Sequence, residues 1–220
     1  MRAPAPRRGP PARRSAPWTA RRGRREPRST PPWPQPRGRG APVSTRRPQP
    51  CHDGPVATIR AATPADLPAI LEIHNEAIVN TTAIWDETPV DLADRVRWYE
   101  TRIEAGHPVL VAEARGEVAG YASYGVFRPR ESYRHTVENA VYVHHDHRRR
   151  GIARQLMVAL LGHACDNPDV HVVLALIESG NTVSIELHED LGFEQTGRLA
   201  EVGRKFDRWL DLTILRRVVG

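Results

Sequence analysis

The chain has few cysteines and no long apolar run, and each shortage excludes a class of protein. Its 220 residues include two cysteines, Cys51 and Cys165, too few for the disulfide framework of a small secreted domain. No stretch reaches the roughly 18 consecutive apolar residues that a membrane-spanning helix needs. We therefore expect a cytoplasmic protein that makes no contact with a membrane and holds its fold without disulfide bonds.

Acidic residues are nearly absent from the first quarter of the chain. Residues 1–55 hold 14 arginines, 14 prolines and two acidic residues, which leaves 18 basic and 24 acidic residues in 56–220. A segment of this composition cannot bury enough apolar surface to offset the entropy of ordering it, so it is predicted to be disordered. Two interpretations of it stay open: an arginine-rich arm that binds nucleic acid or an acidic surface, or a mis-assigned start. Residues 56–220 suit one globular domain, whose net acidic charge makes nucleic acid an unlikely partner.

Apolar periodicity in the second part predicts an α/β domain. Thr63, Pro64 and Asp66 form a helix-start pattern, with Thr63 as N-cap and Asp66 where Glu or Gln is more usual. The predicted order is strand, helix, helix, three strands, helix, strand, helix and two strands. The predicted strands are residues 56–60, 109–113, 118–124, 135–143, 170–177 and, as the last, 209–215, and the predicted helices are residues 63–80, 91–106, 152–165 and 183–191.

The turn between the strand ending at Val143 and the helix beginning near Ile152 predicts an anion site. It carries the pattern Arg148-x-x-Gly151-x-Ala153. A helix start offers unpaired N–H groups and the positive end of the helix dipole, and glycine lets a ligand approach the backbone closely. The turn lacks the Gly-Lys-Ser/Thr of a P-loop and the GxGxxG fingerprint of a dinucleotide site. A phosphate-bearing cofactor is the simplest ligand.

This strand, turn and helix resemble the acetyl-CoA signature of the GNAT superfamily of N-acetyltransferases. A second segment agrees with it, Asn181-x-x-Ser184-x-x-Leu187-His188-x-x-Leu191-Gly192-Phe193. The resemblance covers residues 59–215. It implies the GNAT fold: a mixed, mostly antiparallel sheet, splayed at its centre, with helices on both faces.

Further motifs resemble the phosphinothricin branch of that superfamily, and within it the enzymes that acetylate methionine sulfone and methionine sulfoximine. The resemblance implies transfer of acetyl from acetyl-CoA to the α-amine of a small amino-acid analogue, in a homodimer. Acetylation of protein N-termini or polyamines stays the alternative. The motifs lie in residues 80–85, 121–125, 128–129, 134–138 and 205–212.

The resemblance also implies roles for individual residues. Glu138 is the expected base, since the amine must lose a proton, and His188 is a candidate acid where many GNAT enzymes carry Tyr. Arg128 is expected to hold the substrate's carboxylate, whereas Arg130 stands where close relatives more often have an aromatic residue. Further expected substrate contacts are Asn139, Ala140, Trp85 and Lys205. Expected cofactor contacts are Val141, Tyr142, Val143, Arg149, Arg150, Gly151, Ile152, Ala153, Arg154 and Asn181.

No metal is expected. His144, His145 and His147 offer imidazoles, but they lie on a predicted exposed turn, without a second motif that carries carboxylates.

Overall fold

The computed structural model describes residues 57–219, and the predictions made for the tail of residues 1–55 lie outside this range. One seven-stranded sheet runs through the described part, in the order β1-β2-β3-β4-β5-β7-β6. Every neighbouring pair is antiparallel except β4 and β5, which are parallel. The strands are β1 (Thr58–Ala61), β2 (Val109–Ala114), β3 (Glu117–Val126), β4 (Thr136–Val143), β5 (Val172–Glu178), β6 (Glu194–Lys205) and β7 (Arg208–Val218).

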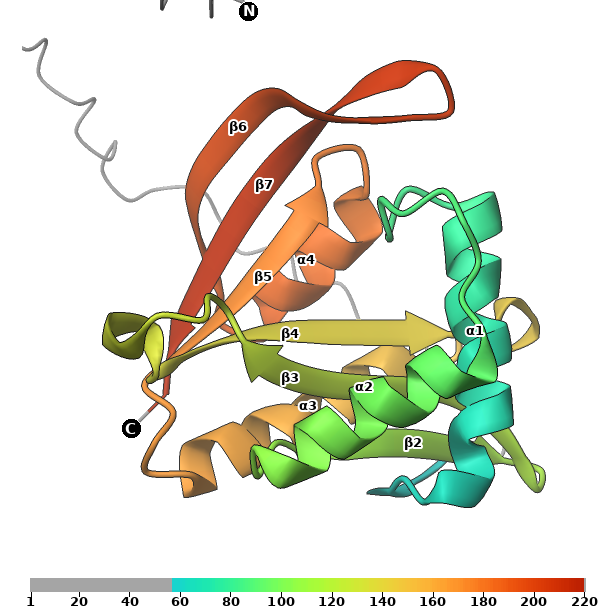
Figure 1. Cartoon of the computed structure of the whole chain (residues 1–220). Helices are drawn as coiled ribbons and strands as arrows, with labels where there is room; N and C mark the ends of the chain where they lie inside the picture. The colour runs from blue at the N-terminus through green and yellow to red at the C-terminus, as the bar shows by residue number, and fades with distance from the viewer. Residues whose placement is uncertain (1–56, 220) are drawn as a thin grey trace, which may run out of the picture. The chain divides into compact units, whose positions relative to one another are not determined.

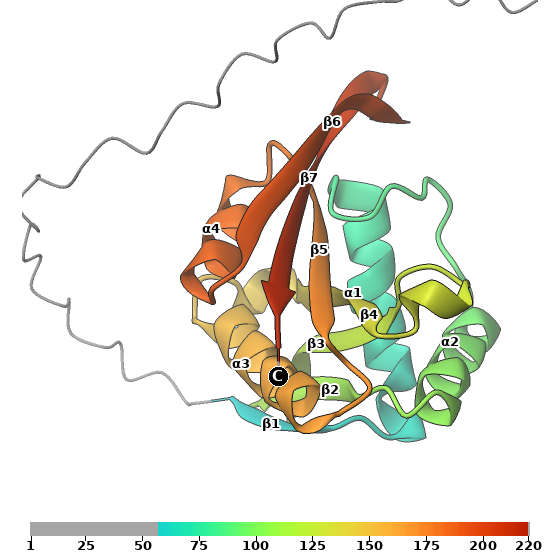
Figure 2. The same cartoon turned by 90° about the vertical axis from the view of Figure 1, so that its left-hand side faces the viewer.

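Helices cover both faces of the sheet (Figure 2), as the alternation of side chains along β3 requires. Tyr121 packs with the helices of one face, and the adjacent Ala122 packs in the larger core on the other face. The first face carries α1 (Leu67–Asn80) and α2 (Leu92–Glu104), and the second carries α3 (Ile152–Asp166) and α4 (Thr182–Asp190). The mixed α/β fold with helices on both faces is therefore confirmed.

The helix start predicted at Thr63 is present, with Asp66 as its acidic partner. The backbone N–H of Thr63 donates to Asp66 Oδ2 at 2.7 Å, and a 3-10 turn, Pro64–Asp66, leads into α1. Arg60 of β1 donates to both oxygens of the same carboxylate, each at 2.8 Å. These hydrogen bonds stabilise the ionised form and lower the pKa of Asp66 to about 2. One buried carboxylate thus links β1 to the turn that leads into α1.

The centre of the sheet is splayed between β4 and β5. These strands pair only over Thr136 to Glu138 and Val172 to Leu174, although β4 continues to Val143 and β5 to Glu178. Figure 1 shows the two strands diverging beyond this short ladder, as the resemblance implied. At the divergence, the Asn139 side chain donates to the carbonyl of Leu174 at 2.8 Å. The backbone hydrogen bonds between β4 and β5 are thus followed by one hydrogen bond from a side-chain amide.

For the majority of helix and strand ends, the observed bound differs from the predicted one by one or two residues. The predicted strand at 170–177 begins at Val172, and the predicted helix at 183–191 runs one residue earlier, Thr182–Asp190. The penultimate strand, which the sequence left without bounds, is the long β6, and it forms a hairpin with β7. None of the helices in residues 57–219 is long and apolar enough to cross a membrane.

Candidate functional site

The cleft between the diverging strands is the candidate site. A cavity of about 70 Å³ lies there, lined by residues of β4, β5 and α4 together with Ala83 of the α1–α2 loop. Asn139, Ala140, Val141 and Tyr142 line it from β4, and Asn181 and His188 line it from the α4 side. Six residues that the sequence singled out separately are therefore neighbours around one cavity.

The cleft and the turn beyond it fit an elongated cofactor with phosphate groups. Residues 139–143 of β4 have no partner strand on the β5 side, so their backbone can pair with an extended ligand. At the far end, Gly151 is exposed with φ 78° and is the N-cap of α3, where nothing lies within 4 Å of the position of a Cβ. The first N–H groups of α3 lack helical partners there, as an anion site requires.

The side chains of this turn divide into free and committed groups. Arg149 and Arg150 are exposed beside Gly151. Arg148 instead donates to the Val143 carbonyl at 3.2 Å and to Glu76 of α1 at 2.7 Å, so it braces the turn. The other expected cofactor contacts differ in what they can offer: Ile152 is buried and presents only its backbone, Ala153 is small, and Arg154 pairs with Asp190 at 3.3 Å.

Glu138 lies on the face of β4 that α1 and α2 cover. It is half-buried, and burial raises its pKa above the usual range for a glutamate. Arg102 of α2 opposes this shift through its positive charge. A carboxylate with a raised pKa accepts a proton more readily than an exposed one, which is what a general base needs.

His188 lies at the opposite wall of the cleft and is 2% exposed. Its Nδ1 lies 2.7 Å from the Ser184 carbonyl, which can only accept, so Nδ1 carries a proton. Its Nε2 lies 3.1 Å from Asn139 Oδ1. Burial lowers the pKa of His188, and the hydrogen bond to Ser184 opposes the shift. The imidazole is thus oriented at both nitrogens, and the one that can change its protonation faces β4.

Arg128 and Arg130 lie on the exposed loop between β3 and β4. The Arg128 guanidinium lies 5.2 Å from the centre of the Phe127 ring, and the backbone N–H of Arg130 donates to the Arg128 carbonyl at 2.8 Å. Both side chains are exposed, and neither forms an ion pair with a described residue. Both guanidinium groups are therefore available to a ligand that reaches this loop.

Trp85 and Lys205 join the α1–α2 loop to the β6–β7 hairpin. The Trp85 ring covers Gly203, where any Cβ would overlap it, and Trp85 Nε1 donates to the Thr82 carbonyl at 3.0 Å. Lys205 is 1% exposed, and its Nζ donates to the carbonyls of Ile78 and Ile84 at 2.5 and 2.6 Å. The lysine expected to contact a substrate already has two buried partners.

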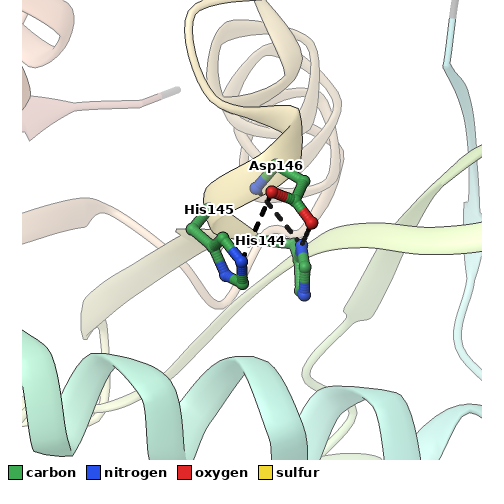
Figure 3. Close-up of side chains that lie close together, drawn as sticks. All are labelled: His144, His145 and Asp146. Carbon is green, nitrogen blue, oxygen red and sulfur yellow. Dashed lines mark hydrogen bonds and ion pairs between the residues drawn. The ribbon is translucent and has the colours of Figure 1, made fainter.

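The histidines before the turn lie close to one carboxylate (Figure 3). Asp146 Oδ1 is 3.3 Å from His145 Nε2, and its Oδ2 is 3.9 Å from His144 Nδ1. One possible ligand atom from each residue lies within 4.8 Å of the others. The sequence reasoning counted the imidazoles without this carboxylate, and the expectation of no metal stays a prediction.

Sequence reasoning missed Arg102, which approaches Glu138 from α2. Its guanidinium occupies the space over Gly125, where a Cβ would overlap it. An isolated glycine inside a strand indicates the close approach of another group, so Gly125 was a usable signal.

Comparisons with known proteins agree with this geometry. Residues 59–214 match the family described as acetyltransferase (GNAT) domain. An L-methionine sulfoximine/L-methionine sulfone acetyltransferase of Pseudomonas aeruginosa is 56% identical over 161 residues, covering 73% of this chain and 93% of that protein. A solved ribosomal-protein-alanine N-acetyltransferase from Brucella melitensis is 52% identical with a TM-score of 0.72, over 74% of this chain and 99% of that one. The structure of yncA from Salmonella typhimurium, with its cofactor acetyl-CoA, is 46% identical with a TM-score of 0.73, over 74% and 94% of the two chains.

Proposed function

The chain belongs to the GNAT family of acetyltransferases, and from this premise we propose that it acetylates the α-amine of a small amino-acid analogue. Methionine sulfone and methionine sulfoximine are the first candidates, because the relative from Pseudomonas aeruginosa is named for them. Phosphinothricin shares the tetrahedral head group and is the next candidate. The observation that carries the proposal is the splayed pair β4 and β5, with Glu138 on one face and His188 at the opposite wall.

Acetyl-CoA, when bound, supplies an acetyl group activated as a thioester. The residues that would hold it are the free backbone edge of 141–143, Asn181, and the turn of residues 149–154. The exposed Arg149 and Arg150 and the N–H groups at the start of α3 complement its phosphates.

Glu138 accepts the amine's proton, through a bridging water, because a protonated amine has no lone pair for attack. His188 is the proposed proton donor to the departing sulfur, through the nitrogen that faces Asn139. On the substrate side, the exposed Arg128 and Arg130 of the β3–β4 loop are the proposed cations for the polar groups of the amino-acid analogue.

Three other predicted substrate contacts are less free. Ala140 lines the cavity and offers a small side chain. The Asn139 amide is committed to Leu174 and His188, and Trp85 is packed on Gly203. We therefore propose that these residues shape the pocket and do not bind a charged group of the substrate.

A thiol-release assay over a substrate panel tests the proposal. Methionine sulfone, methionine sulfoximine and phosphinothricin are compared with an alanine-terminated peptide and a polyamine, on the full chain and on residues 56–220. Turnover of the amino-acid analogues, abolished in Glu138→Gln, is the expected result. Turnover of the peptide alone would instead assign the chain the activity for which the Brucella protein is named.

A homodimer is part of the proposal, and the β6–β7 hairpin supports it. Leu199, Val202, Phe206 and Trp209 are 47%, 49%, 51% and 62% exposed on this hairpin. Exposed large apolar side chains on one hairpin favour its association with another protein surface. Sedimentation of the wild type and Trp209→Glu at matched concentrations tests this, with a shift of the variant to monomer as the expected result.

A further inference from the structure

We propose that Arg102 binds the α-carboxylate of the amino-acid substrate while Glu138 receives the proton of its amine. This assignment rests on the proposed function and adds a carboxylate subsite to it. Arg128, to which the family resemblance assigned this carboxylate, is then left with Arg130 to the polar head group at the far end of the side chain.

Gly125 makes room for the arginine beside the base. In the ladder between β3 and β4, Gly125 is the direct partner of Glu138. Directly paired residues point to the same face of a sheet and have Cβ positions about 5 Å apart. Since Gly125 has no side chain, the Arg102 guanidinium lies over its Cα, in the space a Cβ would take. The cation thus occupies the place next to Glu138 on the face that α1 and α2 cover.

The Arg102 guanidinium is uncommitted. Its Nε is buried without a hydrogen-bond partner, and no described acidic residue forms an ion pair with it. Other arginines near it do have such partners, since Arg95 on the same helix pairs with Asp94 at 2.6 Å. Its aromatic neighbour is Trp98, whose ring centre lies 5.9 Å from Arg102 Cζ. A half-buried cation that lacks a paired anion is a site for an anionic ligand.

Burial also disfavours the charge of this arginine. Desolvation lowers the pKa of Arg102, and the charge of Glu138 opposes the shift, while Arg95 adds to it. A carboxylate placed against the guanidinium would remove this penalty through charge-assisted hydrogen bonds, which Arg can make in pairs.

The chemistry of an α-amino acid matches the spacing of the two groups. Its carboxylate is two bonds from its amine, so an amine linked to Glu138 through one water keeps the carboxylate within reach of a residue adjacent to the base. Gly125 and Glu138 are adjacent across the ladder, so the cation over Gly125 lies at that range. An amine without a carboxylate would meet the same base but leave Arg102 unpaired. The subsite therefore selects amino acids over simple amines.

The test compares methionine sulfone with its decarboxylated analogue, 3-(methylsulfonyl)propylamine, across pH. In Arg102→Gln, kcat/KM for methionine sulfone should fall about 10- to 100-fold, mainly through KM, because a charge-assisted pair of hydrogen bonds is lost. The value for the amine, at the plateau of each pH profile, should change less than about threefold. Arg102→Lys should restore part of the preference. The matched control is Arg97→Gln on the same helix, whose side chain is 68% exposed, and it should leave both substrates unaffected.

Gly125→Ala provides a second variant that keeps the arginine. Its added Cβ would displace the guanidinium, so it should cause the same selective loss for methionine sulfone. An equal loss for both substrates in Arg102→Gln would overturn the carboxylate subsite. It would show that Arg102 positions Glu138 or stabilises the fold. If the wild type acetylates neither compound but does acetylate a peptide or polyamine, the proposed function itself fails.

Discussion

Replacement of Lys205 by methionine gives a sharp test of how the site is built. The lysine ammonium donates to the carbonyls of Ile78 and Ile84, at the end of α1 and in the loop that follows. Ile78 is within the last four residues of α1, whose carbonyls have no partner inside the helix. A cation at this end also complements the helix dipole. Lys205→Met shortens the side chain by one atom and removes the ammonium that donates both hydrogen bonds.

The magnitude follows from the two carbonyls. Each buried carbonyl left without a donor costs about 1–3 kcal/mol, partly offset because the variant no longer buries an ammonium group. A net loss of about 3 kcal/mol in the free energy of unfolding is expected, and this lowers the Tm of a domain of this size by about 6–12 °C. The Trp85 loop should also loosen, since Lys205 and Gly203 hold it from the same strand.

Thermal unfolding followed by circular dichroism measures this effect. Arg204→Met is the matched control, because the neighbouring side chain is 59% exposed and pairs only with Asp207 in the hairpin turn. It should change stability by no more than about 0.5 kcal/mol. If Lys205→Met keeps the wild-type Tm and instead raises the KM for the amino-acid substrate, Lys205 contacts substrate and the structural reasoning is refuted.

Three further predictions test the base, the chain entry and the cofactor turn. Glu138→Gln should lower kcat by about 100-fold or more. Because the pKa of Glu138 is raised, the wild-type rate should fall on the acid side at a pH above the ordinary pKa of a glutamate, and this fall should be absent in the variant. Asp66→Asn should lose about 2 kcal/mol of stability at pH 6 in urea titrations. The pKa of Asp66 is lowered to about 2, so the extra stability of the wild type should be complete above about pH 4 and disappear as the pH falls towards 2. A difference in the free energy of unfolding that does not change with pH would contradict this role of Asp66. Gly151→Val forces a β-branched residue to φ 78°, and it should raise the KM for acetyl-CoA about tenfold or more, with the KM for the amine unchanged in initial-rate assays.

The sequence carried the order of elements and the place of the cofactor turn, because both are local signals. Helix α3 follows a glycine with positive φ, and the strand before it is apolar, so residues 141–153 were interpretable without a structure. The splay was expected only through the family resemblance. The contact where the strands diverge, the Asn139 amide on the Leu174 carbonyl, joins residues 35 positions apart and has no local signature.

The roles of long polar side chains could not be predicted in the same way. The family resemblance implied that Lys205 contacts substrate, yet its partners in the structure are backbone carbonyls 121 and 127 residues away. Arg102 is the opposite case. Its place on an amphipathic helix suggests a solvated residue, whereas the missing side chain at Gly125 lets it lie next to Glu138. Both outcomes depend on tertiary approach, which sequence spacing does not encode.

One amide connects the shape of the cleft to the proton on His188. The Leu174 carbonyl only accepts, so Asn139 presents Nδ2 to it and Oδ1 to His188. The Ser184 carbonyl likewise fixes the proton of His188 on Nδ1. Nε2 and Oδ1 then form a hydrogen bond only when Nε2 is also protonated, which makes the ring a cation. Burial lowers the pKa of His188 and so favours the neutral ring, whereas a hydrogen bond to the amide oxygen needs the charged ring; the proposed proton transfer at Nε2 would use both forms.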